Sequence, residues 1–389
     1  MKPTEPSRLV LEHVGPIQRA DVEFGDLTVL VGPQASGKSI FLQMLNLTVD
    51  IGSVLAALEL YGIEWPAAPD KFLEIYLGEG MGKVWENGRS SIAVDGKRID
   101  LRRLLRSRQE QTQNRAFYVP AHRAIAFQYG WPRPFVDYRA GDPFAVRFFS
   151  ERIRRLLEAG EIKLNGAFPR PEARDSTALG LDDDDVFKGF GLSVDRTGPQ
   201  KRIVLRSRGD GSQLPFMVWS TGQREFVPLL LALDWLLPRS ASRRRGAIDC
   251  VLIEEPEMGL HPQAISSTML RVLQLLRRGY RVCLSTHSPR VLDVIWALKM
   301  LREGGAKPHY VLDLFDVKRS TVMEKLAKII LAKTMRVYYF GAASGQTADI
   351  SNLDPGAANS LESGWGGLIE PSDRRSVSDI VSEVVTNSE

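Results

Sequence analysis

Residues 32–39 constrain the fold of this chain more than any other stretch. They read Gly-Pro-Gln-Ala-Ser-Gly-Lys-Ser, follow the apolar run 27–31 and lead directly into the apolar segment 40–45. A strand, a glycine-rich turn and a helix in this order, with the spacing G-x-x-x-x-G-K-S, are typical of a phosphate-binding loop. The glycines let backbone N–H groups surround a polyphosphate, and the start of the helix adds positive partial charge. The segment therefore predicts a nucleoside-triphosphate site in an α/β fold.

The residue types within this loop predict separate roles. Lys38 is expected to reach the β- and γ-phosphates, and the hydroxyl of Ser39 is expected to bind Mg²⁺. The alternative is a turn rich in Gly and Ser that happens to hold a lysine, and the strand and helix on either side argue against it. The candidate nucleotide-binding residues are Gly32, Pro33, Gln34, Ala35, Ser36, Gly37, Lys38 and Ser39.

Composition narrows the class of protein without identifying it. The 389 residues suffice for one large domain or two, and 43% hydrophobic and 25% charged residues are ordinary for a soluble globular protein. A net charge of +4 permits a nucleic-acid partner but does not require one. Residues 1–7 lack the apolar region of a signal peptide, and the apolar run 226–237 is too short to span a bilayer. We expect a cytoplasmic protein with no membrane partner.

A second candidate site precedes the apolar segment 226–237. A serine at the helix N-cap, a glycine that allows close approach of the backbone and a glutamine in the first turn predict another anion-binding helix start. The residues are Ser220, Thr221, Gly222 and Gln223. A capped helix without any ligand is the alternative for this segment taken alone.

Two further strand ends supply ionisable side chains. The apolar run 248–253 leads into Glu254 and Glu255, and two adjacent carboxylates at a strand end are what a Mg²⁺–nucleotide site needs. One would support the metal and the other would polarise the attacking water. The run 281–285 leads to His287, which could contact the γ-phosphate. Arg123, after the strand-like run 117–119, is expected to be exposed near the same site, with a surface arginine as the alternative.

The remaining patterns predict the surrounding elements. Residues 8–31 predict two antiparallel strands before the phosphate loop, residues 92–100 a hairpin at Asp95-Gly96, and residues 191–206 another hairpin. Residues 143–159 predict a helix. The arginines at 102–108 predict either a solvated basic face or a nucleic-acid contact, and Asp182–Asp185 either an acidic loop or a cation site. Residues 309–312 and 336–340 predict two strands with the helix 321–331 between them, and 374–385 a closing helix.

Taken together, these residues resemble the ABC-type ATPase heads of SMC and RecF proteins, and most closely the stand-alone ATPases of the OLD-like group (AAA_15 or AAA_21). Residues 32–39 match Walker A, 220–223 the signature motif, 251–255 Walker B, 259–262 the D-loop and His287 the H-loop. Residues 118–123 resemble the group's Y-x-P-A-x-R segment, and the tail pattern 365–367 also fits. The resemblance covers nearly the whole chain.

The resemblance implies a fold, a division of roles and cofactors. It implies ATP and Mg²⁺, with Ser39 and Glu254 at the metal, Lys38 and Arg123 at the nucleotide, and Glu255 as the catalytic base. His287 would sense the γ-phosphate, and the signature residues would act on the nucleotide of a partner protomer. The implied fold is an ABC-ATPase head, a P-loop sheet flanked by helices, with an antiparallel β subdomain and a helical signature-motif subdomain. We expect one domain over residues 1–389, its core at 1–50 and 245–389 and an inserted subdomain at 60–240.

Three departures from the general ABC pattern help to choose among relatives. Gln34 replaces the usual Asn, Glu254 stands where many ABC enzymes have Asp, and His261 replaces the D-loop Asp of transporters. The last two match the OLD-like group and count against a transporter subunit. Gln128 is near the Q-loop position, but its spacing leaves the assignment open.

The function that this resemblance implies is an ATP-hydrolysing switch, a homodimer or higher oligomer, in prokaryotic antiviral defence. It would act through a separate effector such as a nuclease, with nucleic acid as a possible trigger. The alternative is a RecF-like or SMC-like DNA-binding ATPase in repair. A nucleotide-sensing scaffold with negligible turnover is a third reading, against which Glu255 argues. Asp313 and Asp316, if they lie on a continuing strand, would point to opposite faces and could not share a nuclease metal.

Overall fold

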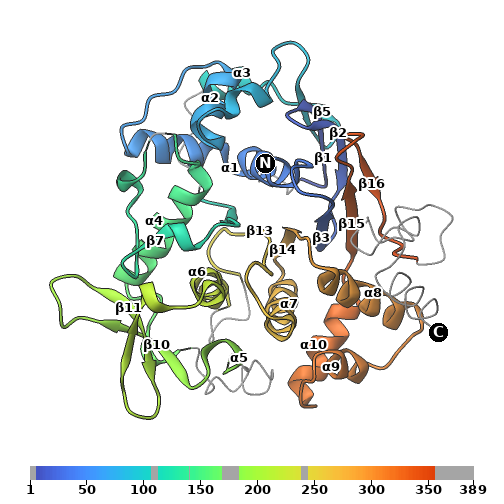
Figure 1. Ribbon diagram of the computed structural model, residues 1–389. Helices are drawn as coiled ribbons and strands as arrows, with labels where there is room; N and C mark the ends of the chain where they lie inside the picture. The colour runs from blue at the N-terminus through green and yellow to red at the C-terminus, as the bar shows by residue number, and fades with distance from the viewer. Residues whose placement is uncertain (1–5, 107–112, 140, 169–183, 238–243, 355–389) are drawn as a thin grey trace, which may run out of the picture.

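A computed structural model describes residues 6–106, 113–139, 141–168, 184–237 and 244–354 (Figure 1). Its centre is a six-stranded sheet with the order β16-β15-β3-β14-β13-β6. Five strands run parallel, and β16 pairs antiparallel with β15 at one edge. The strands are β3 (Leu27–Val31), β6 (Ala116–Val119), β13 (Cys250–Glu254), β14 (Arg281–Ser285), β15 (Met335–Phe340) and β16 (Thr347–Asp349).

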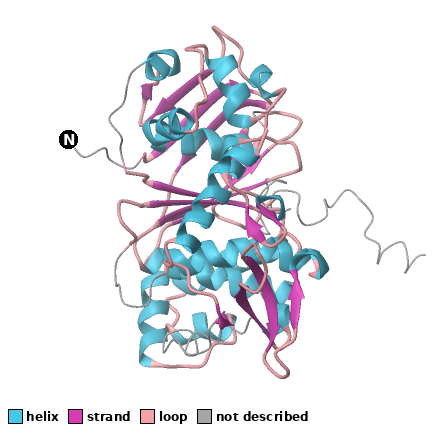
Figure 2. Cartoon of the chain, turned by 90° about the vertical axis from the view of Figure 1, so that its left-hand side faces the viewer, coloured by secondary structure: helices cyan, strands magenta, loops and turns pink. Residues whose placement is uncertain are grey.

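Both faces of this sheet are buried, which explains why its strands are apolar along their whole length. Successive side chains point to opposite faces, so Val29 joins one hydrophobic core and Leu30 the other. Figure 2 shows the strands as a band between two helical layers. The helix α1 (Lys38–Leu60) belongs to one layer. The opposite layer holds α4 (Phe144–Glu158), α6 (Thr221–Leu236), α7 (Pro262–Arg277), α8 (Pro289–Glu303) and α10 (Thr321–Leu331).

Smaller antiparallel sheets flank the central one. The first has the order β2-β1-β4-β5 and the second β12-β11-β10-β9, while β7 and β8 form a short hairpin. The bounds are β1 (Arg8–Val14), β2 (Ile17–Glu23), β4 (Ser91–Val94), β5 (Lys97–Arg98), β7 (Phe127–Gln128), β8 (Trp131–Pro132), β9 (Asn165–Phe168), β10 (Phe190–Asp195), β11 (Arg202–Ser207) and β12 (Gln213–Pro215). The predicted α/β class and the hairpins at 92–100 and 191–206 are confirmed.

Shorter helices complete the described chain. They are α2 (Pro69–Leu77), α3 (Leu101–Arg106), α5 (Asp184–Phe187) and α9 (His309–Leu314), together with the 3-10 turns η1 (Met81–Val84), η2 (Ala124–Ala126), η3 (Phe135–Asp137) and η4 (Phe216–Val218). The residues that α3 exposes include Arg102, Arg103 and Arg106. The predicted tail helix 374–385, the pattern 365–367 and most of the acidic run 182–185 lie outside the described residues.

Two expectations about chain organisation differ from the structure. Residues 60–240 do not form a separate insertion, because β4 pairs with β1 of the N-terminal hairpin and β6 pairs with β13 in the central sheet. Residues 309–312 form the start of helix α9 rather than a strand. A run of four apolar or aromatic residues fits either structure, and here Val311 and Leu312 alone are buried, against the layer of α8 and α10.

The helix α1 is the one described helix long and apolar enough to cross a membrane, with a mean hydropathy of 1.6. Within the 18-residue window of α1 to which this hydropathy refers, 72% is buried inside the protein. Its apolar residues pack on β6, β13 and β14, and its backbone is non-helical at Asp50 (φ −129°, ψ 28°). Asp50 accepts hydrogen bonds there from the backbone N–H groups of Arg115 and Ala116 at the start of β6. The apolar character of α1 is therefore used in the core beneath the phosphate loop.

Candidate functional site

The predicted site residues meet at the carboxyl ends of the central strands. Because β3, β14 and β13 are parallel neighbours, their carboxyl ends lie side by side. The phosphate loop follows β3, His287 follows β14, and Glu254 and Glu255 stand at the end of β13. Ligands of open α/β sheets bind at this kind of edge. The strand order thus brings together residues that lie more than 200 positions apart in the chain.

The backbone of the phosphate loop requires glycine at both ends. Gly32 has φ 138°, and a Cβ there would lie 2.4 Å from the Phe340 carbonyl oxygen. Gly37 has φ 97°, and a Cβ there would lie 2.6 Å from Cγ1 of Ile17. Real Cβ atoms do not approach other atoms so closely, so β15 and the β1–β2 turn dictate the two glycines. The loop is shaped by neighbours as well as by its own sequence.

Lys38 is a buried cation held by its own loop. Its ammonium group donates to the carbonyl oxygens of Gly32 (2.8 Å) and Pro33 (2.7 Å). Burial lowers the pKa of Lys38 to about 8, although the charges of Glu255 and Glu257 act to raise it. A desolvated ammonium without a full counter-charge attracts an anion strongly, which suits a group that binds phosphate.

Glu254 is oriented by β6 and by the residues that follow it. The Tyr118 hydroxyl donates to Oε1 of Glu254, and the Ala121 N–H donates to Oε2 at 3.3 Å. Burial raises the pKa of Glu254, which the bonds from Tyr118, Ala121 and Ser39 oppose. The Ser39 hydroxyl and this carboxylate are therefore close enough to interact. Hard oxygen donors of this kind suit Mg²⁺, so Ser39 and Glu254 are the residues that would hold the metal.

Glu255 faces the histidine at the end of β14. Its Oε1 lies 3.4 Å from Nε2 of His287, and both side chains are 27% exposed. Burial and the charge of Lys38 lower the pKa of His287, while Glu255 opposes them. The backbone of Glu255 has φ 41°, a left-handed conformation that costs a non-glycine residue about 1–2 kcal/mol. The chain turns after Glu254, and the two carboxylates have different partners: Tyr118 and Ala121 for Glu254, and His287 for Glu255.

Glu257 joins the two strand ends and was not among the predicted site residues. Its Oε1 accepts from the Thr286 hydroxyl (2.8 Å) and from the His287 backbone N–H (2.6 Å). Its Oε2 is buried and has no hydrogen-bond partner among the described residues, and the same holds for Oγ of Ser285. These two buried oxygens at the ends of β13 and β14 could accept hydrogen bonds from metal-bound water, and in this respect the residues fit Mg²⁺. The sequence signal for Glu257 was its place two residues after Glu255.

Arg123 does not lie where the sequence suggested. It was expected to be exposed and to bind ATP, whereas its side chain is fully buried and only the neighbouring His122 is exposed. Its guanidinium donates to the backbone carbonyls of Glu225, Glu254 and Glu255, so it lies behind the end of β13. The expectation failed because Arg123 follows a strand end and then turns inward, and sequence does not report that direction. A direct contact with nucleotide is not what this geometry supports.

The signature segment forms the capped helix start that the sequence predicts. Ser220 accepts from the Gln223 N–H (3.2 Å), and the Gln223 side chain accepts from the Ser220 N–H (3.0 Å). Gln223 also donates to the Val186 carbonyl oxygen (2.9 Å). Ser220 and Thr221 are exposed, and Gly222 lies against the D-loop residue Gly259. Among the described residues, no hydrogen bond joins this segment to the phosphate loop of the same chain.

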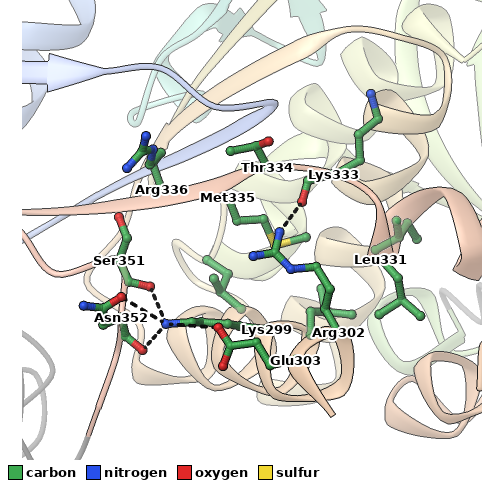
Figure 3. A pocket seen from close by; sticks show the side chains of 13 residues that line it. Lys299, Arg302, Glu303, Leu331, Lys333, Thr334, Met335, Arg336, Ser351 and Asn352 are labelled. Atoms are coloured by element: carbon green, nitrogen blue, oxygen red, sulfur yellow. Dashed lines mark hydrogen bonds and ion pairs between the residues drawn. The ribbon is translucent and has the colours of Figure 1, made fainter. Parts of the chain in front are cut away.

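A cavity of about 230 Å³ lies elsewhere in the molecule, between α8, the start of β15 and Ser351–Asn352 (Figure 3). β15 runs parallel to β3, and Met335 is its first residue. Met335 therefore lies at the amino ends of the strands, whereas the phosphate loop lies at their carboxyl ends. The basic side chains that line this cavity already have hydrogen-bond or ion-pair partners. Lys299 contacts the Asn352 carbonyl and Glu303, and Arg302 contacts the Lys333 carbonyl. Lys333 pairs with Asp26, and Arg336 pairs with Glu23 and Asp349. This cavity is separate from the nucleotide site.

The fold and this site define a P-loop ATPase, an enzyme that binds and hydrolyses ATP. The family described as "AAA domain, putative AbiEii toxin, Type IV TA system" (AAA_21) matches residues 94–293, more than half of the chain. The chain belongs to this AAA_21 family of ATPases. The matched region holds the signature segment, both strand-end glutamates and His287, and the phosphate loop precedes it.

Other similarities are more distant. The "Old nuclease" of Escherichia phage P2 is 21% identical over 194 residues, which are 49% of this chain and 28% of that protein. The match therefore spans less than a third of that relative. An SMC head bound to the C-terminal winged-helix domain of ScpA has a TM-score of 0.40 at 12% identity, covering 75% of this chain and 91% of that one. The SMC head of Thermotoga maritima has a TM-score of 0.35 at 12% identity, covering 89% and 98%. These scores are too low to assign the fold, which the strand order above establishes.

Proposed function

We propose that this ATPase is a dimeric switch in which ATP is bound between two copies of the chain. The observation that supports this most is the exposure of Ser220 and Thr221 at a helix start that is built to face an anion. Their hydrogen bonds are confined to the cap itself. The capping box uses the N–H groups of Ser220 and Gln223, while those of Thr221 and Gly222 have no hydrogen-bond partner among the described residues. This helix start suits the nucleotide of a second protomer, with Ser220, Thr221, Gly222 and Gln223 acting in trans.

The surface beside this segment also suits an interface. Met217 and Val218, three and two residues before Ser220, are 64% and 63% exposed. Two large apolar side chains in sequence next to a functional motif favour burial against another protein surface. A second copy of the chain brings its own phosphate loop to this place in a composite site. The exposed apolar pair then becomes part of the contact.

The association can be tested with a charge placed in the proposed contact. Met217→Asp should prevent ATP-dependent dimerisation, measured by light scattering after gel filtration, while ATP still binds the monomer. Tyr310→Asp is the matched control, because Tyr310 on α9 is also an exposed apolar residue (51%) but lies away from the signature segment. Dimerisation that survives in Met217→Asp, or is lost equally in both variants, contradicts this interface.

We infer further that the switch works in the cytoplasm through a separate effector protein, in defence against phage. The family description names a toxin of a type IV toxin–antitoxin system, and the matched relative is a phage nuclease. The described residues hold no group of three or more His, Cys, Asp or Glu side chains placed to bind a metal. Asp313 lies on helix α9 and pairs with Arg319, and Asp316 follows that helix, so the predicted strand geometry was wrong. The ion pair with Arg319 gives the Asp313 carboxylate a structural partner, which supports a role for Asp313 outside metal binding.

Incubation of the purified chain with ATP, Mn²⁺ or Mg²⁺, and DNA or RNA tests the separate effector. ATP hydrolysis with intact nucleic acid is the expected result. Cleavage that disappears in Asp313→Asn or Asp316→Asn would overturn the proposal. A Glu255→Gln control separates cleavage that depends on ATP hydrolysis from contamination by another nuclease.

The second candidate function is an ATPase that binds DNA directly, as in repair. It is favoured by α3, where Arg102, Arg103 and Arg106 are exposed on a helix of six residues. The effect of DNA on the rate of ATP hydrolysis distinguishes the two functions. Duplex DNA that stimulates ATP hydrolysis several-fold, with the stimulation lost in Arg102→Glu/Arg103→Glu, would favour this function over the effector-linked switch.

A further inference from the structure

Arg123 makes contact with three separate segments of the chain at once. Its Nε donates to the Glu225 carbonyl oxygen on α6 (3.0 Å), which is the helix that the signature segment begins. Its terminal nitrogens donate to the carbonyl oxygens of Glu254 (2.9 Å) and Glu255 (3.2 and 3.3 Å). A fourth acceptor, the carbonyl of Pro120, lies 3.2 Å away in the segment of Arg123 itself. The planar guanidinium thus bridges α6 and the end of β13.

The environment of this side chain makes the bridge rigid. Arg123 has no exposed surface, and the Glu225 carboxylate that accompanies it is also buried. That carboxylate accepts from the backbone N–H groups of Arg123 (2.8 Å) and Ala124 (3.1 Å), and it lies 4.0 Å from Nε. A buried guanidinium that loses a partner cannot replace it with water, so the bonded set is kept as a unit.

The hydrogen bonds of Arg123 end at Glu255, whose backbone has an unfavourable left-handed conformation. Glu255 is the residue with φ 41° at the end of β13, and its N–H donates to the Ser285 carbonyl oxygen (3.0 Å). Its carbonyl is held by Arg123. The turn that aims the Glu255 side chain at His287 is therefore fixed from β14 on one side and from Arg123 on the other. Any movement of α6 reaches this turn through the Glu225 carbonyl.

We propose that Arg123 is a positioning residue that couples the signature helix α6 to the carboxylate of Glu255. Engagement of the signature segment with nucleotide shifts or locks α6, and the guanidinium transmits this to the backbone of Glu254 and Glu255. Hydrolysis is therefore faster when the signature segment at the start of α6 contacts nucleotide than when it does not. This inference rests on the proposed function, because it takes Glu255 as the base and Ser220–Gln223 as the segment that senses the second protomer.

The test separates positioning from stability by comparing two arginines that both donate to backbone carbonyls beside β6. Arg123→Lys replaces a planar group that reaches four carbonyls with a point donor. We expect kcat to fall at least tenfold while KM and the dissociation constant of a fluorescent ATP analogue stay within about twofold. Arg152→Lys is the matched control. Arg152 donates to the Ala116 carbonyl at the other end of β6 (3.1 Å) and stacks on Phe117, so its change should leave kcat unaltered.

Chemical rescue supplies a readout that a purely structural role would not produce. In Arg123→Ala, millimolar guanidinium chloride should restore part of the lost kcat in a saturable way, and sodium chloride at equal ionic strength should not. If Arg123→Ala does not fold, Glu225→Gln tests the same link, because it removes the charge that faces the guanidinium and keeps the side-chain shape. It should lower kcat at least threefold with ATP affinity unchanged.

The outcomes that overturn the inference are distinct from failure of the proposed function. The coupling is contradicted if kcat of Arg123→Lys stays within twofold of wild type. It is also contradicted if kcat, ATP affinity and Tm all fall together. Glu255→Gln is measured alongside. If it hydrolyses ATP at the wild-type rate, the base assignment in the proposed function is wrong. If it is inactive while Arg123→Lys behaves as wild type, only the coupling is wrong.

Discussion

The backbones of Gly222 in the signature segment and Gly259 in the D-loop touch each other. A Cβ on Gly222 would lie 2.4 Å from the Gly259 carbonyl oxygen, and Gly259 itself has φ 72°. The start of α6 and the turn after β13 are thus in direct contact within one chain. The first residues of α6 cannot move without disturbing the turn between β13 and α7.

Gly222→Ala should slow hydrolysis because the new methyl group must push α6 and the D-loop apart. We expect at least a tenfold loss of kcat with ATP binding to the phosphate loop unchanged, measured by steady-state kinetics and by binding of a fluorescent ATP analogue. Gly198→Ala is the control, since that glycine has open space around it and no left-handed φ. Equal kinetics for Gly222→Ala and Gly198→Ala would show that the contact is not needed.

Lys38→Ala should weaken ATP binding by about 100-fold or more, because it removes the charged donor that the loop offers the γ-phosphate. Lys38 bonds only to its own loop, so the fold should survive. Calorimetric titration with ATP and a thermal melt measure the two effects. Unchanged affinity in a folded variant would remove the phosphate-loop assignment.

Glu255→Gln should leave ATP binding intact and slow hydrolysis about 100-fold or more, as expected for loss of a general base. The variant should accumulate as an ATP-bound dimer. Glu257→Gln is the comparison, because its carboxylate holds Thr286 and His287 and does not face outward like that of Glu255. Full turnover in Glu255→Gln, with loss confined to Glu257→Gln, would move the base two residues along the chain.

Ser220→Arg should block hydrolysis while the monomer still binds ATP, because the bulky cation obstructs the exposed helix start. A tagged heterodimer of one Lys38→Ala chain and one Ser220→Arg chain gives a sharper result. In a trans arrangement both changes fall in one composite site and the other site stays whole, so activity remains. An inactive heterodimer argues against composite sites, unless the two sites hydrolyse ATP only together.

Glu151→Gln should reduce stability at neutral pH and have little effect in acid. Burial acts to raise the pKa of Glu151, but hydrogen bonds from Arg154, Arg155 and the Phe135 N–H outweigh it and lower the pKa to about 2. A depressed carboxyl pKa stabilises the fold above the ordinary value of 4.5, and this contribution is lost as pH falls from 4.5 towards 2. Thermal melts across this range should show the two proteins converging. A constant difference in Tm at every pH would contradict the ion-pair explanation.

The sequence determined the strand, loop and helix around Lys38, the capped start of α6 and the buried strand that ends in Glu254 and Glu255. Each depends on interactions between residues close in the chain, such as glycine conformations, an N-cap side chain and a continuous apolar run. For the same reason the hairpins at 92–100 and 191–206 were predictable.

Only the tertiary structure decided which residues support these motifs and where the chain divides. Residues 309–312 were expected to form a strand but form a helix, since four apolar or aromatic residues fit either pattern until packing selects the face that is buried. Strand β6 joins the central sheet through pairing with β13, a contact between segments more than 130 residues apart. Arg123 was expected at the nucleotide, yet its guanidinium turns inward because three carbonyls from α6 and β13 converge there. Such convergence depends on strand order and burial, which no local pattern in the sequence encodes.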